Sequence, residues 1–259
     1  MNTSVNSWSS PPKTLTLGSD EVHVWCASLK RTESCLQSLQ QTLSKDEHTR
    51  AERFHFQKDR EHFIVARGLL RAILSRYLGR EPSHLSFCYN QNGKPALTEA
   101  DGGDTLRFNL SHSHGLALYA VTQNRDIGVD LEYIRADFPC EQIAERFFSP
   151  QENSVLRMIP AHMKHQAFFN CWTRKEAYIK AMGKGLSIPL DQFDVTLALG
   201  EPAVLLNTIW DSQEACRWSL QELFPSPGYA AALAVEGSGW QLKRWQLPLE
   251  RPSSAQELP

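Results

Sequence analysis

Two carboxylates, Asp130 and Glu132, stand two residues apart in the segment Asp-Ile-Gly-Val-Asp-Leu-Glu, which covers residues 126–132. Apolar and acidic residues alternate at its end, which is typical of a β-strand, and on a strand the two carboxylates share one face. Like charges on one face repel each other, so such a pair occurs either on a solvated edge or around a cation such as Mg²⁺. This segment alone leaves both interpretations open.

A third carboxylate, Glu176, falls on the apolar face of a helix predicted over residues 164–182. The apolar stripe of this face is formed by Phe168, Phe169, Trp172 and Ile179. An ionised carboxylate there costs several kcal/mol unless it is paired or coordinated, so Glu176 needs a cation. Lys175 and Lys180 flank the stripe, and a structural ion pair with one of them is the alternative to a third magnesium ligand.

Three short segments carry groups that can meet a phosphate. Residues 92–95 read Asn-Gly-Lys-Pro, a turn that leaves Lys94 exposed. His112 is flanked by serines on both sides and, taken alone, is a solvated or core histidine. Residues 183–185 read Gly-Lys-Gly but follow a helix and lack the rest of a Walker pattern, so they are interpreted as a helix end and turn.

The elements that must position these residues occur in two successive blocks. The first begins with a strand predicted over residues 22–29 and a helix over 45–78 that ends at Gly79. Its shorter strands are predicted over residues 84–89, 106–110 and 116–121. The second block has the helix over 164–182, followed by strand-like runs over 193–199, 216–220 and 228–235.

The order of elements in the two blocks indicates an internal duplication. His62 and His165 are 103 residues apart, and the similar runs that begin at Gly115 and Gly228 are 113 residues apart. Chance similarity of two helices is the alternative. A duplication predicts two similar α+β halves, residues 21–124 and 125–248, with a ligand cleft between them. The polar ends, residues 1–20 and 249–259, are predicted to be flexible tails.

Composition narrows the function classes. The chain has 259 residues, 41% of them hydrophobic, and a net charge of −2 without a basic stripe, which disfavours nucleic acid or an anionic membrane as a partner. No apolar run is long enough for a membrane span and the start lacks a signal peptide, so a cytoplasmic protein is predicted. The six cysteines form no Cys-x-x-Cys pair, which argues against a zinc site or a disulfide framework.

Taken in order, the motifs resemble those of the Sfp-type 4'-phosphopantetheinyl transferases. The resemblance is carried by residues 92–95, by Phe-Asn-Leu-Ser-His-Ser at 108–113, by Gly-Val-Asp-Leu-Glu at 128–132, by Arg-Phe-Phe-Ser at 146–149 with Glu152, by Trp-Thr-Arg-Lys-Glu-Ala-Tyr-Ile-Lys at 172–180, and by Gly-Lys-Gly-Leu at 183–186. It covers about residues 53–195, over half of the chain.

The resemblance implies an α+β fold of two pseudo-symmetric halves, each a helix packed on a small antiparallel sheet, with coenzyme A and Mg²⁺ in the cleft between them. It implies metal ligation by Asp130, Glu132 and Glu176. The coenzyme A contacts that it implies are Lys94, Pro95, Ser111, His112, Lys175, Lys180, Arg60 and Arg67. It also implies a monomer, because one chain carries both halves of the site.

In the implied reaction, a serine of an apo acyl or peptidyl carrier protein attacks the phosphorus that bears pantetheine, and 3',5'-ADP leaves. Glu176 is expected to take the serine proton, Lys180 to stabilise the leaving phosphate and His112 to orient a phosphate oxygen. Two alternatives are another magnesium enzyme of nucleotide or pyrophosphate substrates and a non-catalytic module that binds coenzyme A or a carrier protein.

Overall fold

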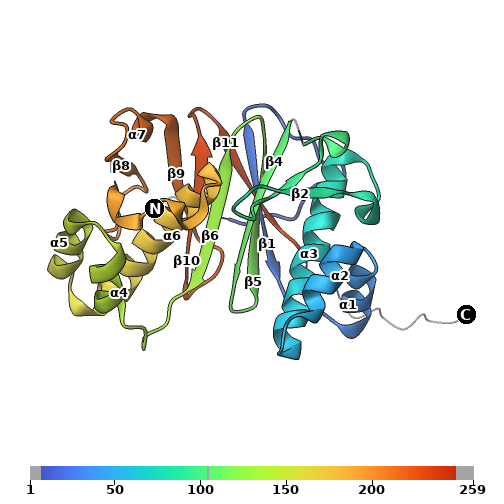
Figure 1. The fold of residues 1–259 in the computed structure, drawn as a ribbon, viewed down its shortest axis with the longest axis horizontal. Coiled ribbons are helices and arrows are strands. Elements are labelled where there is room, and N and C mark those ends of the chain that lie inside the picture. Colours follow the sequence, from blue (N-terminus) through green and yellow to red (C-terminus); the bar gives the residue numbers. More distant parts are fainter. Residues whose placement is uncertain (1–6, 104, 249–259) are drawn as a thin grey trace, which may run out of the picture.

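Two β-sheets pack against each other in the middle of the molecule, with one long helix on the outer face of each (Figure 1). The structure is a computed structural model, and it describes residues 7–103 and 105–248. Apolar side chains on the inner faces of both sheets form a shared core, which includes Val24, Leu118, Val129 and Leu233. Within the described residues, no helix combines the length and the apolar character that crossing a membrane requires.

The first sheet has the strand order β11-β1-β5-β4 and is covered by helix α3. The bounds of these elements are β11 Gln241–Gln246, β1 Glu21–Ser28, β5 Leu116–Gln123, β4 Leu106–Ser113 and α3 Gln57–Leu78. The apolar face of α3, with Leu70 and Leu74, packs on Trp25 and Tyr119 of the sheet. Smaller elements surround it: α1 Glu33–Gln40, α2 Lys45–Glu52, β2 Phe87–Tyr89 and β3 Pro95–Leu97.

The second sheet has the order β6-β10-β9 and is covered by helix α6. The bounds are β6 Ile127–Tyr133, β10 Tyr229–Glu236, β9 Trp218–Leu223 and α6 Lys164–Met182. Further out lie α4 Cys140–Phe147, α5 Pro150–Met158, β7 Phe193–Val195, β8 Leu205–Thr208 and α7 Glu214–Arg217. Helix α6 lies unusually close to β6 at Gly128, which has no side chain to keep the two apart. A Cβ added at Gly128 would stand only 2.0 Å from the carbonyl oxygen of Ala177.

The two halves share one topology, which confirms the predicted fold class. In each half the first strand pairs with the last, and the last pairs with the strand before it, giving β1-β5-β4 and β6-β10-β9. The long helices end alike, at Gly79 with φ 62° and at Gly183 with φ 66°. Gly115 and Gly228 both adopt positive φ immediately before the matching strands β5 and β10. This agreement in strand order and helix ends supports the prediction of two similar α+β halves.

Three elements differ from the sequence prediction. The single helix expected over residues 45–78 is two helices, interrupted where Phe54 turns back to pack on Phe63 with ring centroids 5.4 Å apart. Strand β11 was not predicted, and although it follows the second half in the chain, it pairs in parallel with β1 of the first sheet and covers its otherwise open edge. Residues 7–20, expected to be a flexible tail, are packed: Trp8 donates to the Phe224 carbonyl at 2.8 Å, and Leu15 and Leu17 contact the core. The tail predicted over residues 249–259 lies outside the described residues.

The halves meet along a seam between β4 and β6 that is closed by side chains rather than by a main-chain ladder. Alternate residues of β4 accept hydrogen bonds from alternate backbone N–H groups of β6: Asn109 from Val129 at 2.8 Å, Ser111 from Leu131 at 3.3 Å and Ser113 from Tyr133 at 3.1 Å. Because side chains alternate on a strand, all three acceptors point to the same neighbour. The motif at residues 108–113 thereby joins the halves beside Asp130 and Glu132.

Candidate active site

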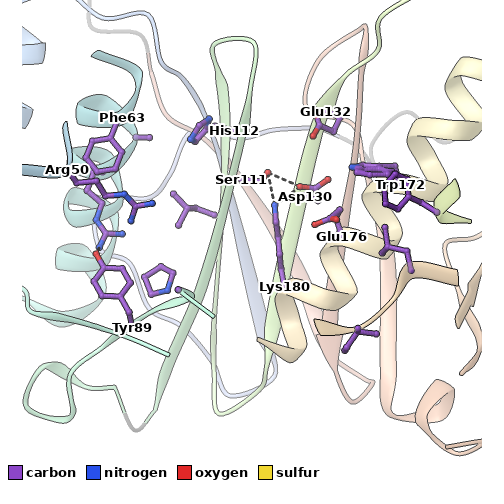
Figure 2. Close-up of a pocket in the computed structure, with 18 of the residues that line it drawn as sticks. Arg50, Phe63, Tyr89, Ser111, His112, Asp130, Glu132, Trp172, Glu176 and Lys180 are labelled. Carbon is purple, nitrogen blue, oxygen red and sulfur yellow. Dashed lines mark hydrogen bonds and ion pairs between the residues drawn. The ribbon is translucent and has the colours of Figure 1, made fainter. Parts of the chain in front are cut away.

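A cleft of about 860 Å³ lies between the two halves (Figure 2). Its floor carries the polar residues Ser111, His112, Asp130, Glu132, Glu176 and Lys180. The wall from the first half includes Arg50, Phe54, Phe63, Arg67, Tyr89 and Pro95. The wall from the second half includes Phe147, Trp172, Ile188, Pro189 and Leu190. A polar floor between a cationic and aromatic wall and an apolar wall suits a ligand with both a charged and an apolar part.

Helix α6 presents one narrow face to the cleft. Trp172, Glu176 and Lys180 are spaced four residues apart, line the cleft and are half-buried, whereas most of the other residues of the helix are buried. The close approach permitted by Gly128 brings this face next to Asp130 on β6. Of the apolar stripe expected around Glu176, Trp172 shares its face, whereas Phe168, Phe169 and Ile179 are buried in the core. Glu176 therefore faces the carboxylates of the cleft rather than a pairing lysine.

Asp130 is the most enclosed of the three carboxylates, at 3% exposure. Its Oδ1 atom accepts a hydrogen bond from the Ser111 hydroxyl at 2.9 Å and from the Lys180 ammonium at 2.5 Å. Its Oδ2 atom is buried and has no hydrogen-bond partner among the residues that the structure describes. A buried carboxylate oxygen without a partner is costly, and coordination of a cation is one way to offset that cost.

The other two carboxylates have raised pKa values. Burial, followed by the nearby charge of Asp130, raises the pKa of Glu176 to about 6. Burial and then Asp130 also raise the pKa of Glu132, although its Oε2 atom accepts a hydrogen bond from the Ser113 hydroxyl at 3.1 Å. Burial is the larger cause of both shifts, and the neighbouring negative charge adds to it.

These three carboxylates fit a hard divalent cation such as Mg²⁺. Mg²⁺ prefers oxygen ligands, and Asp130 offers an oxygen that no other group within residues 7–103 and 105–248 satisfies. As the side chains stand, no group of three His, Cys, Asp or Glu within residues 7–103 and 105–248 has the arrangement of a formed metal site. The fit therefore rests on the chemistry of Asp130, Glu132 and Glu176 and on the partnerless Oδ2 atom.

His112 and Ser111 lie on β4 at the floor of the cleft. Ser111 is buried and is already engaged with both Asp130 and the backbone of β6. His112 is exposed to the cleft, and the surrounding protein, followed by the charge of Lys180, lowers the pKa of its imidazole. A neutral imidazole that faces the cleft can donate or accept a hydrogen bond toward a ligand.

The first half supplies a cationic and aromatic wall that the sequence analysis identified only through Arg67. Arg67 pairs with the buried Glu47 and donates to the Tyr89 hydroxyl at 2.6 Å. Arg50 lies over the ring of Phe63, 5.5 Å from its centroid. Figure 2 shows Arg50, Phe63 and Tyr89 opposite Trp172 and Glu176. Their sequence signal is weak, because single arginines and aromatics on helices also occur as ordinary surface and core residues.

Lys175 does not reach the cleft, which corrects its predicted role as a coenzyme A contact. Its side chain is fully buried on the far side of α6, where Nζ lies 2.8 Å from the carboxylate of Glu152 and donates to the carbonyls of Leu190 and Phe193. An ammonium with this many partners and no exposure is a structural ion pair. The ion-pair alternative from the sequence is found, but with Glu152 in place of Glu176.

Two other predicted coenzyme A contacts also lie away from the main cleft. Arg60 is exposed on the first turn of α3, beside a separate hollow, and donates weakly to the Phe54 carbonyl at 3.4 Å. Lys94 is directed to the carbonyls of Ile127 and Ala181, each at 3.0 Å, and burial lowers the pKa of its ammonium to about 8. Pro95, the next residue, does line the cleft.

Comparison with known proteins agrees with this geometry. Residues 25–124 match the family described as 4'-phosphopantetheinyl transferase, N-terminal, and residues 126–234 match the 4'-phosphopantetheinyl transferase superfamily. The chain is 47% identical over 240 residues to 4'-phosphopantetheinyl transferase HetI from Nostoc sp., which covers 93% of this chain and 98% of that relative.

More distant relatives match over most of their length as well. 4'-Phosphopantetheinyl transferase Sfp from Bacillus subtilis is 31% identical, covering 74% of this chain and 82% of the relative. 4'-Phosphopantetheinyl transferase psf-1 from Bacillus pumilus is 33% identical, covering 80% of this chain and 84% of the relative. The chain therefore belongs to the 4'-phosphopantetheinyl transferase superfamily.

Proposed function

We propose that this enzyme transfers the 4'-phosphopantetheine group of coenzyme A to a serine of an apo acyl or peptidyl carrier protein and releases 3',5'-ADP. One observation carries the proposal beyond family membership: Asp130, Glu132 and Glu176 meet Lys180 at the floor of one cleft between the halves. This combination suits phosphoryl transfer, because the attacked pyrophosphate and the leaving group both carry negative charge. The carboxylates can hold a cation that offsets this charge, and Lys180 is itself a cation.

Each cleft residue has a task in this reaction. Asp130, Glu132 and Glu176 would hold Mg²⁺, which when bound neutralises charge on the pyrophosphate. Glu176, which lines the cleft beside Asp130 and Lys180, takes the proton of the carrier serine. Lys180 stabilises the phosphate that departs with 3',5'-ADP, and His112 donates to a phosphate oxygen.

The walls of the cleft suit the two ends of coenzyme A. Arg50 and Arg67, beside Phe63 and Tyr89, offer cations and aromatic rings to the adenine and its phosphates. The opposite wall, with Phe147 and Trp172, offers an apolar surface to the pantetheine arm. In this arrangement the bond that breaks lies over the polar floor.

The domain limits, the location and the assembly state belong to the same proposal. We place the boundary of the two halves between residues 124 and 125, and we expect the enzyme to be cytoplasmic. One chain is expected to form the complete site, since it contains both halves of the cleft. A monomer is expected because the site needs no second copy. Light scattering across a dilution series tests this, and activity that is lost on dilution would contradict it.

Mass spectrometry tests the transfer itself. An apo fatty-acid, polyketide or peptidyl carrier protein is incubated with the enzyme, coenzyme A and Mg²⁺, and one phosphopantetheine per carrier serine is expected. Omission of either coenzyme A or the divalent cation should abolish the mass gain. Binding of coenzyme A without a mass gain on any of the three carriers would instead favour the non-catalytic binding module.

A further inference from the structure

The loop between β2 and β3 reaches across the boundary of the halves and contacts the C-terminal end of α6. The side-chain amides of Asn90 and Asn92 both donate to the carbonyl of Gly183, at 2.7 and 3.0 Å. The ammonium of Lys94 donates to the carbonyl of Ala181 at 3.0 Å. Within the described residues, three side chains of one half thus satisfy the last carbonyls of a helix in the other half.

Hydrogen bonds within the loop hold it in the conformation that makes this contact. The side-chain oxygen of Asn90 accepts hydrogen bonds from the backbone N–H groups of Asn92 and Lys94, at 3.0 and 2.9 Å. Gly93 takes a positive φ of 80°, which the turn requires and a side chain disfavours. Asn90 therefore fixes the loop with its oxygen and reaches Gly183 with its nitrogen.

Lys94 suits the end of α6 by its charge as well as by its hydrogen bonds. The last carbonyls of a helix lack partners inside the helix, and the helix dipole places partial negative charge there. The ammonium also donates to the carbonyl of Ile127 at 3.0 Å, so it joins the end of α6 to the start of β6. Burial lowers the pKa of the Lys94 ammonium to about 8, as expected for an ammonium that is surrounded by protein groups instead of water.

The two carbonyls that Lys94 holds lie next to the residues of the cleft. Ala181 directly follows Lys180 on α6, and Ile127 lies three residues before Asp130 on β6. Lys180 and Asp130 form the ion pair at the floor of the cleft. A single ammonium therefore ties together the two backbone segments that carry this pair, although it lies outside the cleft.

We propose that Lys94, supported by Asn90 and Asn92, is a positioning residue that holds the last turn of α6 on the start of β6 and thereby orients Lys180 for the transfer. This rests on the proposed function of Lys180 in the same cleft. It departs from the expectation that Lys94 contacts a coenzyme A phosphate, because its ammonium is engaged with two carbonyls.

Steady-state kinetics of Lys94→Met separate the two roles. Loss of positioning should lower kcat about 10-fold to 100-fold with a KM for coenzyme A that changes less than about 2-fold. Lys58→Met, which removes an exposed lysine of α3, is the matched control and should behave as the unmodified enzyme. A rise in KM for coenzyme A at unchanged kcat would overturn the proposal in favour of a phosphate contact.

A double-mutant cycle with Lys180→Met tests whether Lys94 acts through Lys180. The combined variant should be scarcely slower than Lys180→Met alone, because the orientation of a side chain that is absent has no effect. Full additivity of the two losses would contradict the proposal. Should Lys94→Met fold poorly, Asn92→Ala removes one hydrogen bond to Gly183 and should show the same non-additivity with a smaller fall in kcat.

Hydrogen exchange provides a readout that does not depend on catalysis. In Lys94→Met, the amides of residues 180–185 should exchange faster than in the unmodified protein, while those of α3 stay unchanged. Unaltered exchange at the end of α6 would overturn the positioning role. If the unmodified enzyme modified no carrier at all, the proposed function would fall, whereas the exchange result would still decide whether Lys94 holds α6.

Discussion

The ammonium of Lys180 lies 2.5 Å from Oδ1 of Asp130, while Oδ2 of the same carboxylate is buried and receives no hydrogen bond from the described part of the chain. One oxygen of Asp130 is therefore satisfied from α6, and the other remains available to a cation. The relationship depends on the close packing of α6 on β6 at Gly128. It joins the group proposed to stabilise the leaving phosphate directly to a proposed metal ligand.

Removal of Asp130 or Glu132 should weaken Mg²⁺ binding more than it damages the chemistry. Asp130→Ala and Glu132→Ala are expected to recover part of their rate at high Mg²⁺, and the double variant should lose less than the two single losses combined, because both act on one ion. Turnover measured against Mg²⁺ concentration checks this. A rate deficit that is independent of Mg²⁺ would contradict a shared metal site.

Glu176→Gln should separate proton removal from metal binding. The amide keeps the side-chain volume and one oxygen but cannot take a proton, so kcat is expected to fall about 100-fold or more at any Mg²⁺ concentration while coenzyme A still binds. A thermal melt of the same protein is the control. If this variant melts early yet turns over at the unmodified rate when folded, Glu176 is structural and its assigned catalytic role is wrong.

Ser113→Ala should lower the affinity for Mg²⁺ through Glu132. The Ser113 hydroxyl donates to Glu132 Oε2 and accepts from the Tyr133 N–H, so its loss frees the carboxylate and opens the end of the seam. A loss of about 10-fold in metal affinity is typical of a group that orients a ligand. Calorimetric titration with Mg²⁺ measures it, with the exposed Ser38→Ala as the control. Equal affinity in both variants would show that Ser113 serves the seam alone.

Lys175→Met should destabilise the fold without affecting coenzyme A binding. Removal of one partner of a buried ion pair leaves Glu152 unpaired, at a cost of about 3–5 kcal/mol in the free energy of unfolding. The double variant with Glu152→Gln should lose less than the two single losses summed. Urea unfolding and coenzyme A titration of the folded protein check both points. Normal stability with weakened coenzyme A binding would restore the phosphate contact that the resemblance implies.

The carboxylate of Glu21 should stabilise the protein to its full extent only above its unfolded pKa. Hydrogen bonds from Lys243 and from the Gly18 N–H lower its pKa from 4.5 to about 2, so the ionised form is favoured by folding. This contribution is fully present above about pH 4.5 and disappears as the pH falls toward about 2. The difference in unfolding free energy between the unmodified protein and Glu21→Gln should shrink between about pH 6 and pH 3.5. A constant difference would show that the Lys243 contact adds nothing.

Local patterns in the sequence are sufficient to predict the elements that carry the proposed catalytic residues. The helix predicted over residues 164–182 coincides with α6, and the strand that contains Asp130 and Glu132 directs both carboxylates to the cleft, with Val129 and Leu131 in the core. These features follow from periodicity, which depends only on neighbours in the chain. Periodicity also places Glu176 on the same face of α6 as Trp172.

Tertiary structure decided which of the cations face the cleft. A lysine can satisfy its charge with a ligand phosphate, a buried carboxylate or backbone carbonyls, and nothing in the residue type distinguishes these partners. Packing within the second half directs Lys180 to Asp130 and Lys175 to Glu152, and the contact between the halves directs Lys94 to the end of α6. The same holds for β11, whose pairing with β1 brings together residues about 220 positions apart. Contacts of such long sequence separation leave no periodic signal, so only the folded chain determines them.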